Sequence, residues 1–186
     1  YKGLSLYDLQ IFKESKNSFI YCIKLIFKEF YPKRDITDYS TIEEEFETTN
    51  IIKKAKSNKK YSLNVGEIFY YLGLIEYNEK KYNECIKYMS ICLLYNEKND
   101  SAYYNQGLCF ASLKKENDSL KCFEKVIAIN PNNELAHFKL GNIYYGRKDK
   151  EKAIKHYILA HNLNNKSHYY LINIGKCYLD LKKYNR

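Results

Sequence analysis

The apolar and polar positions of this 186-residue chain follow a helical period over most of its length. From residue 66 onward, apolar residues recur three and four positions apart, a spacing that is typical of amphipathic helices. Short polar segments interrupt the pattern at regular intervals. We therefore predict an all-α chain with helices near residues 66–79, 82–96, 101–113, 116–130, 134–147, 150–164 and 168–182.

Four glycines recur within these predicted helices, each 34 positions after the one before: Gly73, Gly107, Gly141 and Gly175. A glycine in a helix interior is less stable than alanine by about 0.5–1 kcal/mol. Four such glycines at one spacing indicate that another helix must approach closely at each of them. The chain is therefore predicted to be a tandem array of helix–turn–helix units.

The second helix of each unit repeats as well. Small residues at the same spacing stand four positions before bulky ones, and a further small residue follows three positions later. This face is predicted to pack on the glycine helix of the same unit. The small, bulky and small residues are Cys85, Met89 and Cys92, then Ser119, Phe123 and Val126, then Ala153, Tyr157 and Ala160.

Together these residues resemble the tetratricopeptide repeat (TPR) family, whose pattern is W-x2-L-G-x2-Y…A-x3-F…P. The second unit closes on Pro131, but Gln106 departs from the pattern at its Leu place, as Glu76 does at the aromatic place of the first. The resemblance implies an α-solenoid, a right-handed superhelix of stacked repeats. The third unit matches best, with His137, Leu140, Gly141, Tyr144, Ala153, Tyr157 and Ala160.

The repeat register divides the chain into two predicted parts. Residues 66–186 form the array, as repeats 66–99, 100–133 and 134–167 and a partial repeat 168–186. Residues 1–65 form a helical segment, a degenerate repeat or a cap, with helices expected at 4–14, 17–31 and 40–57. We interpret the apolar stretch 19–31 as core packing on the first repeat. A membrane-surface or partner-binding helix is the alternative.

Composition and charge narrow the classes of function. The net charge is +9, but the lysines are scattered along the chain, which is typical of solvated helix faces. No apolar run reaches about 18 residues, so no membrane partner is expected. The six cysteines form no CxxC pair and lie among apolar residues, which favours a reducing compartment, the cytoplasm or alternatively the nucleus.

No constellation for catalysis emerges. The glycines are used by repeats and turns, so no phosphate-binding loop is present, and the four histidines form no HExxH motif. His137 is interpreted as a packed core histidine, and the acidic residues around Glu44 as a solvated cluster. We predict that the chain is not an enzyme and that it holds no metal and no cofactor.

The family resemblance implies that the first helix of each repeat lines a concave, peptide-binding surface. Tyrosine provides a large amphipathic contact area and asparagine can hydrogen-bond a peptide backbone. Such a groove suits an extended or helical protein segment with apolar anchors, although tyrosines that are merely solvated remain the alternative. The predicted partner-binding residues are Tyr70, Tyr71, Leu74, Tyr77, Tyr104, Asn105, Leu108, Phe138, Lys139, Asn142, Tyr145, Asn173 and Lys176, with Tyr169 beside them.

The resemblance leaves three kinds of function open. The first is a protein-interaction scaffold within a larger multi-protein assembly. The second is a substrate-recruiting arm of a larger enzyme like O-linked GlcNAc transferase, whose asparagine ladder Asn105 and Asn173 match but Tyr71 and Lys139 interrupt. The third is an RNA-binding helical repeat, which the scattered charge disfavours.

Two features of the array bear on its partners. TPR domains that bind the acidic C-termini of Hsp70 and Hsp90 use a Lys, Asn and Arg cluster. Here Tyr70, Leu74 and Leu135 stand at three of those places, which disfavours that class. The half repeat at 168–186 leaves an apolar face uncovered, so we expect either that the full protein continues or that this face packs on another chain. The oligomeric state is left open.

Overall fold

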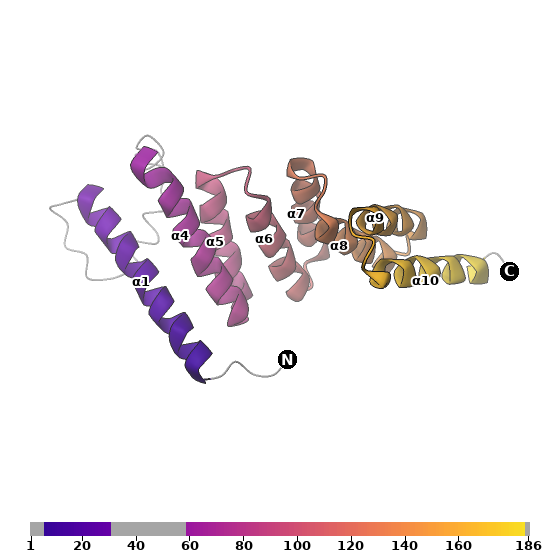
Figure 1. The fold of residues 1–186 in the computed structure, drawn as a ribbon, viewed down its shortest axis with the longest axis horizontal. Helices are drawn as coiled ribbons and strands as arrows, with labels where there is room; N and C mark the ends of the chain where they lie inside the picture. The colour runs from indigo at the N-terminus through magenta and orange to yellow at the C-terminus, as the bar shows by residue number, and fades with distance from the viewer. Residues whose placement is uncertain (1–5, 31–58, 185–186) are drawn as a thin grey trace. The chain divides into compact units, whose positions relative to one another are not determined.

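The computed structural model describes residues 6–30 and 59–184, and these two ranges form helices and no strand (Figure 1). Seven helices correspond to the predicted ones, and their ends agree within two residues except at the start of α4. The helices are α1 (Leu6–Phe30), α4 (Lys59–Asn78), α5 (Tyr82–Tyr95), α6 (Asp100–Ser112), α7 (Glu116–Ile129), α8 (Glu134–Gly146), α9 (Lys150–Leu163) and α10 (His168–Tyr184).

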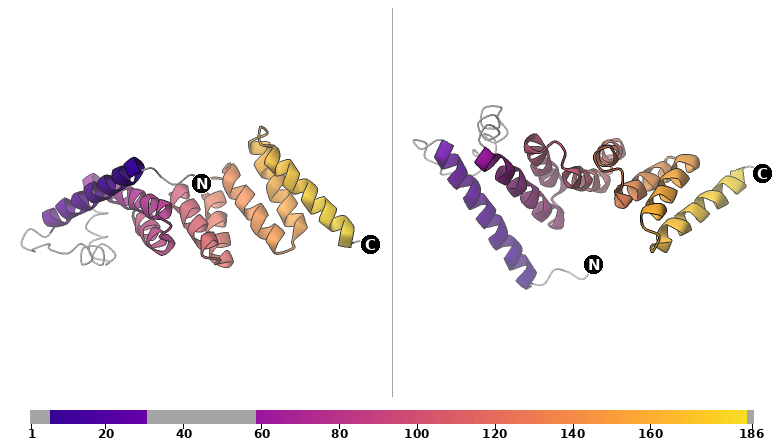
Figure 2. Two further views of the ribbon diagram at one scale, coloured as in Figure 1. Left: turned by 90° about the horizontal axis from the view of Figure 1, so that it is seen from below. Right: turned by 45° about the horizontal axis from the view of Figure 1, so that its top comes forward.

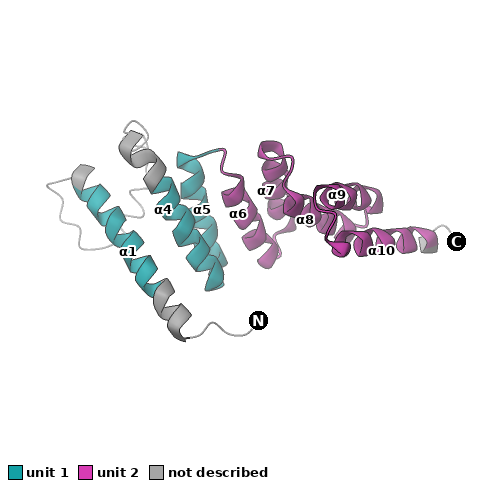
Figure 3. Cartoon of the chain, viewed as in Figure 1, with its two compact units in different colours: residues 1–97 teal, residues 98–186 magenta. Residues whose placement is uncertain are grey.

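The chain divides into two compact units, Tyr1–Glu97 and Lys98–Arg186 (Figure 3). In the first unit, α1 and α5 each pack against α4. In the second unit, neighbouring helices pack in chain order as α6 with α7, α7 with α8, α8 with α9 and α9 with α10. The two further views in Figure 2 show α10 lying alongside α9. The predicted boundary between residues 65 and 66 stays a prediction.

The prediction of two separate helices at 4–14 and 17–31 is wrong, because α1 runs unbroken from Leu6 to Phe30. Ser18, which could have capped a second helix, donates its hydroxyl back to the Glu14 carbonyl at 2.9 Å and so stays inside the helix. The start predicted for α4, residue 66, is also wrong, because the helix extends back to Lys59. No glycine or proline between Lys59 and Gly66 interrupts it. The helix predicted at 40–57 lies outside the described residues.

The turns inside the repeats are built on one lysine each, at the same position of successive repeats. Lys80, Lys114 and Lys148 have φ values of 60°, 59° and 65°. The amide after each of these lysines donates to a carbonyl five residues earlier, as from Asp149 to Tyr144 at 3.0 Å. This is the hydrogen bond of a Schellman motif, which ends a helix in the left-handed conformation.

Asparagine side chains cap the starts of α6 and α8, the first helices of the second and third repeats. The carboxamide of Asn99 accepts from the Ala102 amide at 2.9 Å, and that of Asn133 accepts from Ala136 at 3.0 Å. Each satisfies an amide that has no partner within its helix. These two asparagines occupy equivalent positions of successive repeats, so the caps and the turns reproduce the repeat.

The predicted contact between the glycines and the bulky residues is confirmed in three repeats. A Cβ added to Gly73 would lie 2.7 Å from Met89 Cε, one on Gly107 would lie 2.9 Å from Phe123 Cε1, and one on Gly141 would lie 2.5 Å from Tyr157 Cε1. Side chains closer than about 3 Å must move apart, so each glycine makes room for its neighbour. A Cβ added to Gly175, by contrast, would meet no atom of a neighbouring element within 4 Å among the described residues.

Both departures from the family pattern are buried and paired. Glu76 is 2% exposed and forms an ion pair with Lys16 of α1. Gln106 accepts a hydrogen bond from the Cys122 thiol at 3.6 Å, and burial raises the pKa of that thiol to about 12. All six cysteines are free. Among the residues that the structure describes, no helix is long and apolar enough to cross a membrane.

His137 of α8 is buried, as predicted, and faces another histidine, His156 of α9. Its Nε2 lies 3.0 Å from the Pro131 carbonyl, and its Nδ1 lies 3.2 Å from Nδ1 of His156. The ring of Tyr144 stacks on His156 with 5.5 Å between centroids. Burial, the larger cause, and the neighbouring His137, the smaller one, lower the pKa of His156 to about 4, so this arrangement favours the neutral form of His156.

This pair is expected to make stability depend on pH. When the chain unfolds, His156 returns to its ordinary pKa of 6.5, so the unfolded state binds the proton first as the pH falls. The free energy of unfolding should therefore fall between pH 6.5 and pH 4 and be unaffected by His156 above that window. The urea midpoints of the wild type and of His156→Gln are measured by circular dichroism at pH 7 and at pH 5. Relative to the wild type, the midpoint of the variant should be higher at pH 5 than at pH 7, so that it approaches or exceeds that of the wild type. A midpoint difference that stays constant with pH would contradict this.

Candidate functional site

The predicted aromatic contacts of the second unit are largely used for packing. The ring of Tyr104 lies 5.5 Å from that of Phe123, and Phe138 lies 5.9 Å from Tyr157 and 5.4 Å from Tyr170. Both Tyr104 and Phe138 are partly buried. They hold the first helix of a repeat against its neighbours and offer a partner only part of their surface.

Tyr145 is held inside the α8, α9 and α10 contact. Its hydroxyl donates to the Asp180 carboxylate at 2.8 Å, and the Lys150 ammonium lies 3.3 Å above its ring. The same ammonium lies 3.3 Å from Asp180, so three side chains tie α10 to the turn between α8 and α9. The sequence prediction of Tyr145 as a groove contact did not anticipate this structural role.

Three polar candidates share one position in the first helices of successive repeats. Asn105 of α6, Lys139 of α8 and Asn173 of α10 occupy the same place in successive repeats and are partly buried. The amide groups of Asn105 and Asn173 donate to carbonyls of their own helices, at 2.8 Å to Ser101 and 2.7 Å to Tyr169. Their donors are therefore partly committed before any partner arrives.

Lys139 differs from these two asparagines in its electrostatics. Burial lowers the pKa of its ammonium, and no neighbouring charge among the described residues contributes to that shift. A partly desolvated cation without an opposite charge gains from an incoming carboxylate or carbonyl oxygen. Of the predicted residues, Lys139 thus has the most to gain from binding.

A hollow adjoins Asn142, one turn along α8 from Lys139. Its volume is about 350 Å³, and it is lined by Ala111, Lys114, Glu116, Ser119, Asn142 and Ile143. Asn142 is exposed and accepts a hydrogen bond from the Tyr157 hydroxyl at 2.8 Å. Apart from Asn142, sequence reasoning missed this hollow, because its walls include the turn between α6 and α7. No sequence signal marks it, because the left-handed φ of Lys114 is seen only in the structure.

The remaining candidates of the second unit differ in their exposure. Leu108 is partly buried on α6, and Lys176 is exposed on α10. Tyr169 is the most exposed of the large apolar side chains described, at 70%. These residues extend the accessible side of the first helices without forming a hydrogen-bonded cluster.

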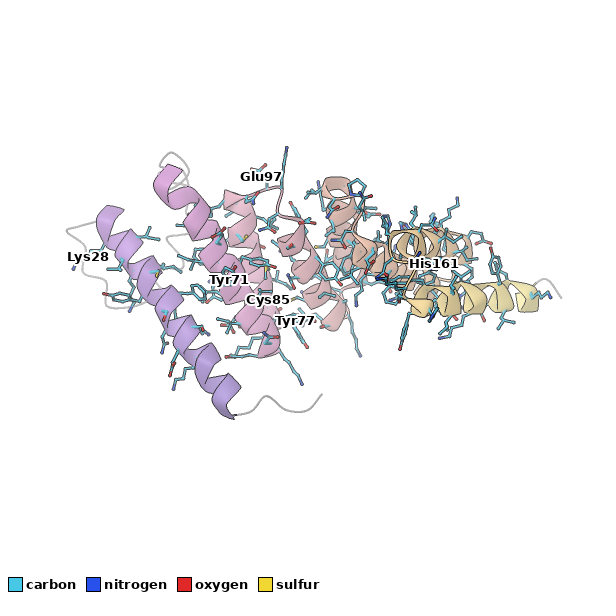
Figure 4. All side chains as sticks on the ribbon, in the orientation of Figure 1. Lys28, Tyr71, Tyr77, Cys85, Glu97 and His161 are labelled. Atoms are coloured by element: carbon cyan, nitrogen blue, oxygen red, sulfur yellow. The ribbon has the colours of Figure 1, made fainter. Side chains whose placement is uncertain are left out.

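In the first unit, α1 lies against part of the predicted surface. Tyr71 points from α4 toward α1, where its ring stacks on Phe19 at 5.6 Å (Figure 4). Tyr70 lies edge-on to Tyr71, and Tyr77 lies 6.0 Å from Tyr82. Tyr71 therefore contributes to packing between α1 and α4, while Tyr70, Leu74 and Tyr77 are partly buried.

Comparison of the sequence with known families supports the repeat assignment. Two profiles described as tetratricopeptide repeat match residues 101–133 and 122–155. Residues 101–155 are tetratricopeptide repeats. The TPR match covers the second repeat and the start of the third, whose first helices both have 13 residues and second helices both have 14. No curated protein sequence matches the chain.

Solved structures of TPR domains share the fold. The first TPR of Spaghetti (RPAP3) bound to the HSP90 peptide SRMEEVD is 18% identical with a TM-score of 0.61, over 64% of this chain and 95% of that one. The OM64 TPR domain from Arabidopsis is 16% identical with a TM-score of 0.61, over 64% and 98%. The Yersinia enterocolitica type III secretion chaperone SycD, in complex with a peptide of the translocator YopD, is 13% identical with a TM-score of 0.58, over 61% and 92%.

The TPR architecture thus accounts for the part of the chain that these structures cover, about 64%. Within the described residues, no group of three His, Cys, Asp or Glu side chains is placed to hold a metal ion. What the site offers a ligand is a strip of amide, ammonium and aromatic groups on the first helices of the second unit, next to a hollow.

Proposed function

We propose that this chain is a protein-interaction module and that its second unit binds a peptide segment along the accessible sides of α6, α8 and α10. The observation that carries the proposal is the partly buried ammonium of Lys139, which pairs with no carboxylate of the described residues and lies between Asn105 and Asn173 in the repeat register. A ligand that brings an acidic side chain or a backbone carbonyl to this point would satisfy it.

The peptides bound to two of the similar structures support this class of ligand. The HSP90 peptide of the first is acidic at its end, but this chain has Tyr70, Leu74 and Leu135 where that subtype places its polar contacts. The proposed ligand is therefore a segment with one acidic residue and apolar anchors. It would dock the chain into a larger multi-protein assembly, in the cytoplasm, where the free cysteines stay reduced.

The asparagine-ladder alternative gains no support from the geometry. The Asn105 and Asn173 amides already donate to their own helices, and Lys139 stands between them. These positions therefore do not form the row of available carboxamides that an asparagine ladder requires.

The proposal can be tested with selected peptides. Random twelve-residue peptides displayed on phage are selected on the purified chain, and the dissociation constants of the binders are measured by fluorescence anisotropy. Lys139→Glu should weaken these peptides at least tenfold, about 1.4 kcal/mol, because it replaces the unpaired cation with an anion. The peptide SRMEEVD should bind more weakly than the selected peptides.

The matched control is Lys125→Glu, which makes the same charge change at an exposed position of α7. It should change affinity less than twofold. Equal effects of both variants, or none from Lys139→Glu, would show that the peptides bind elsewhere. Alanine variants of Tyr104 and Phe138 are unsuitable here, because both rings pack on buried aromatic residues and their loss would destabilise the fold.

A further inference from the structure

The hollow beside Asn142 is bounded by three elements of the second unit: the end of α6, the start of α7 and the second half of α8. Its volume of about 350 Å³ lies at the lower end of the range of about 300–1,000 Å³ that is usual for ligand pockets. A single large side chain of a bound peptide therefore fits it, whereas a large cofactor does not.

Part of the lining is apolar. Ala111 of α6 is exposed, and Ile143 of α8 is partly buried. Ser119 of α7 offers no hydroxyl hydrogen to a ligand, because it donates to the Gly107 carbonyl at 2.9 Å. An occupant of the hollow therefore gains most by burying an apolar body against Ala111 and Ile143.

Two polar groups of the lining are held in place and have hydrogen-bonding capacity left. Asn142 uses its carboxamide oxygen to accept from the Tyr157 hydroxyl at 2.8 Å, which leaves its NH2 group as a donor. Glu116 uses Oε1 to accept from Arg147 Nε at 2.6 Å, which leaves Oε2 as an acceptor. Both bonds fix the orientation of the group before a ligand arrives, so the hollow presents one oriented donor and one oriented acceptor.

The charges around the hollow disfavour a charged occupant. The Lys114 ammonium repels a cationic side chain, and the Glu116 carboxylate repels an anionic one. An aliphatic side chain would displace water from Asn142 and Glu116 without replacing its hydrogen bonds. A phenolic hydroxyl replaces both, since it can accept from an amide and donate to a carboxylate at the same time.

We propose that this hollow is the subsite for a tyrosine of the peptide that binds along α6, α8 and α10. This inference rests on the proposed function and adds a second residue to its ligand. The tyrosine ring lies against Ala111 and Ile143, while its hydroxyl accepts from Asn142 and donates to Glu116. Tyrosine buries a large amphipathic area at a low cost in side-chain entropy, because it has only two torsions to fix.

The register of α8 sets the spacing within the peptide. Lys139, which meets the acidic residue, and Asn142 are three residues apart on one helix, so their Cβ atoms are about 5–6 Å apart. In an extended peptide, side chains two positions apart point the same way and are separated by about 6–7 Å. The ligand therefore carries its tyrosine two positions from its acidic residue.

The subsite is tested first without the rest of the peptide. The probe is N-acetyltyrosinamide, titrated into the isotope-labelled chain while the NMR signals of Ile143 and of the Asn142 side-chain amide are followed. These signals should shift saturably, with a dissociation constant of about 1–10 mM. N-acetylphenylalaninamide, which lacks the hydroxyl, should bind about fivefold more weakly. The Lys139→Glu chain should bind the tyrosine probe within twofold of the wild type.

A filled hollow provides the matched variant. Ala111→Phe places a ring in the hollow from an exposed helical position and should abolish the saturable shifts. Ala128→Phe makes the same change at an exposed position of α7 outside the hollow and should leave the affinity within twofold. The urea midpoints of both variants, read by circular dichroism, show that they are folded.

The peptides selected from the random library then test the connection to Lys139. Aligned on their acidic residue, they should carry tyrosine two positions away. Replacing that tyrosine with alanine should weaken a peptide at least tenfold on the wild-type chain, but less than twofold on Ala111→Phe, where the hollow is already filled.

Failure of the subsite can be distinguished from failure of the proposed function. The subsite is overturned if N-acetyltyrosinamide gives no saturable shift, or if it binds equally to the wild type and Ala111→Phe; peptide binding that depends on Lys139 would survive either result. Selected peptides without tyrosine at the stated spacing would overturn the two-residue ligand. If the probe binds in the hollow while Lys139→Glu leaves the selected peptides unaffected, the proposed function fails and the subsite holds by itself.

Discussion

Replacing Gly141 with alanine is expected to destabilise the protein by about 1–3 kcal/mol, whereas the same replacement at Gly175 is expected to stabilise it by up to about 1 kcal/mol. At Gly141 the new Cβ would lie 2.5 Å from the ring of Tyr157. That ring cannot swing away, because its hydroxyl donates to Asn142 at 2.8 Å. At Gly175 only the gain in helix propensity remains.

The measurement is urea denaturation of both variants, followed by circular dichroism at 222 nm and fitted with a common slope. Gly73→Ala is the intermediate control, because its neighbour is the flexible end of Met89, which can move. Its effect should lie between the other two. The same sign of change at Gly141 and Gly175 would contradict the packing described here.

The second large effect is expected at Lys16. Replacing Lys16 with methionine should destabilise the first unit by about 3 kcal/mol, because it leaves the Glu76 carboxylate buried without its partner. Lys81 is a weak substitute: its ammonium lies 3.9 Å from Glu76 Oε2 and is itself half exposed. The loss is read from the urea midpoint.

A double variant separates the lost ion pair from lost packing. Adding Glu76→Phe places an aromatic residue where the family pattern has one and removes the buried charge. The double variant Lys16→Met/Glu76→Phe should recover most of the stability. If it is as unstable as Lys16→Met alone, the ion pair is not what connects α1 to α4.

The sequence predicted the repeat helices well because each one is specified locally. A glycine and a bulky residue 16 positions later define each of the three full repeats, and that contact forms within the repeat. The asparagine caps of α6 and α8 lie only three residues from the amides they bind. The continuity of α1 was missed because serines and asparagine in its middle read as a helix start. The partner of Glu76 could not be predicted, since it lies 60 residues earlier in the chain.

The candidate site was only partly predictable for a different reason. Tyrosine is amphipathic, so its place on the first helix does not reveal whether its ring packs or its hydroxyl binds. Tyr145 illustrates this, because its hydroxyl is bound to Asp180, 35 residues further on. The role of Lys139 could not be predicted either. It depends on burial by neighbouring helices, which the position in the repeat alone does not reveal.

The left-handed lysines of the turns bear on how this protein can change over generations. Lys80, Lys114 and Lys148 hold a conformation that glycine adopts with less strain, yet the chain keeps lysine at all three. Each turn is therefore a single substitution away from a less strained form, and none of the three is among the predicted partner-binding residues. A lineage exposed to higher temperature has these positions available for adaptation, and mutations that weaken the fold elsewhere can be compensated there.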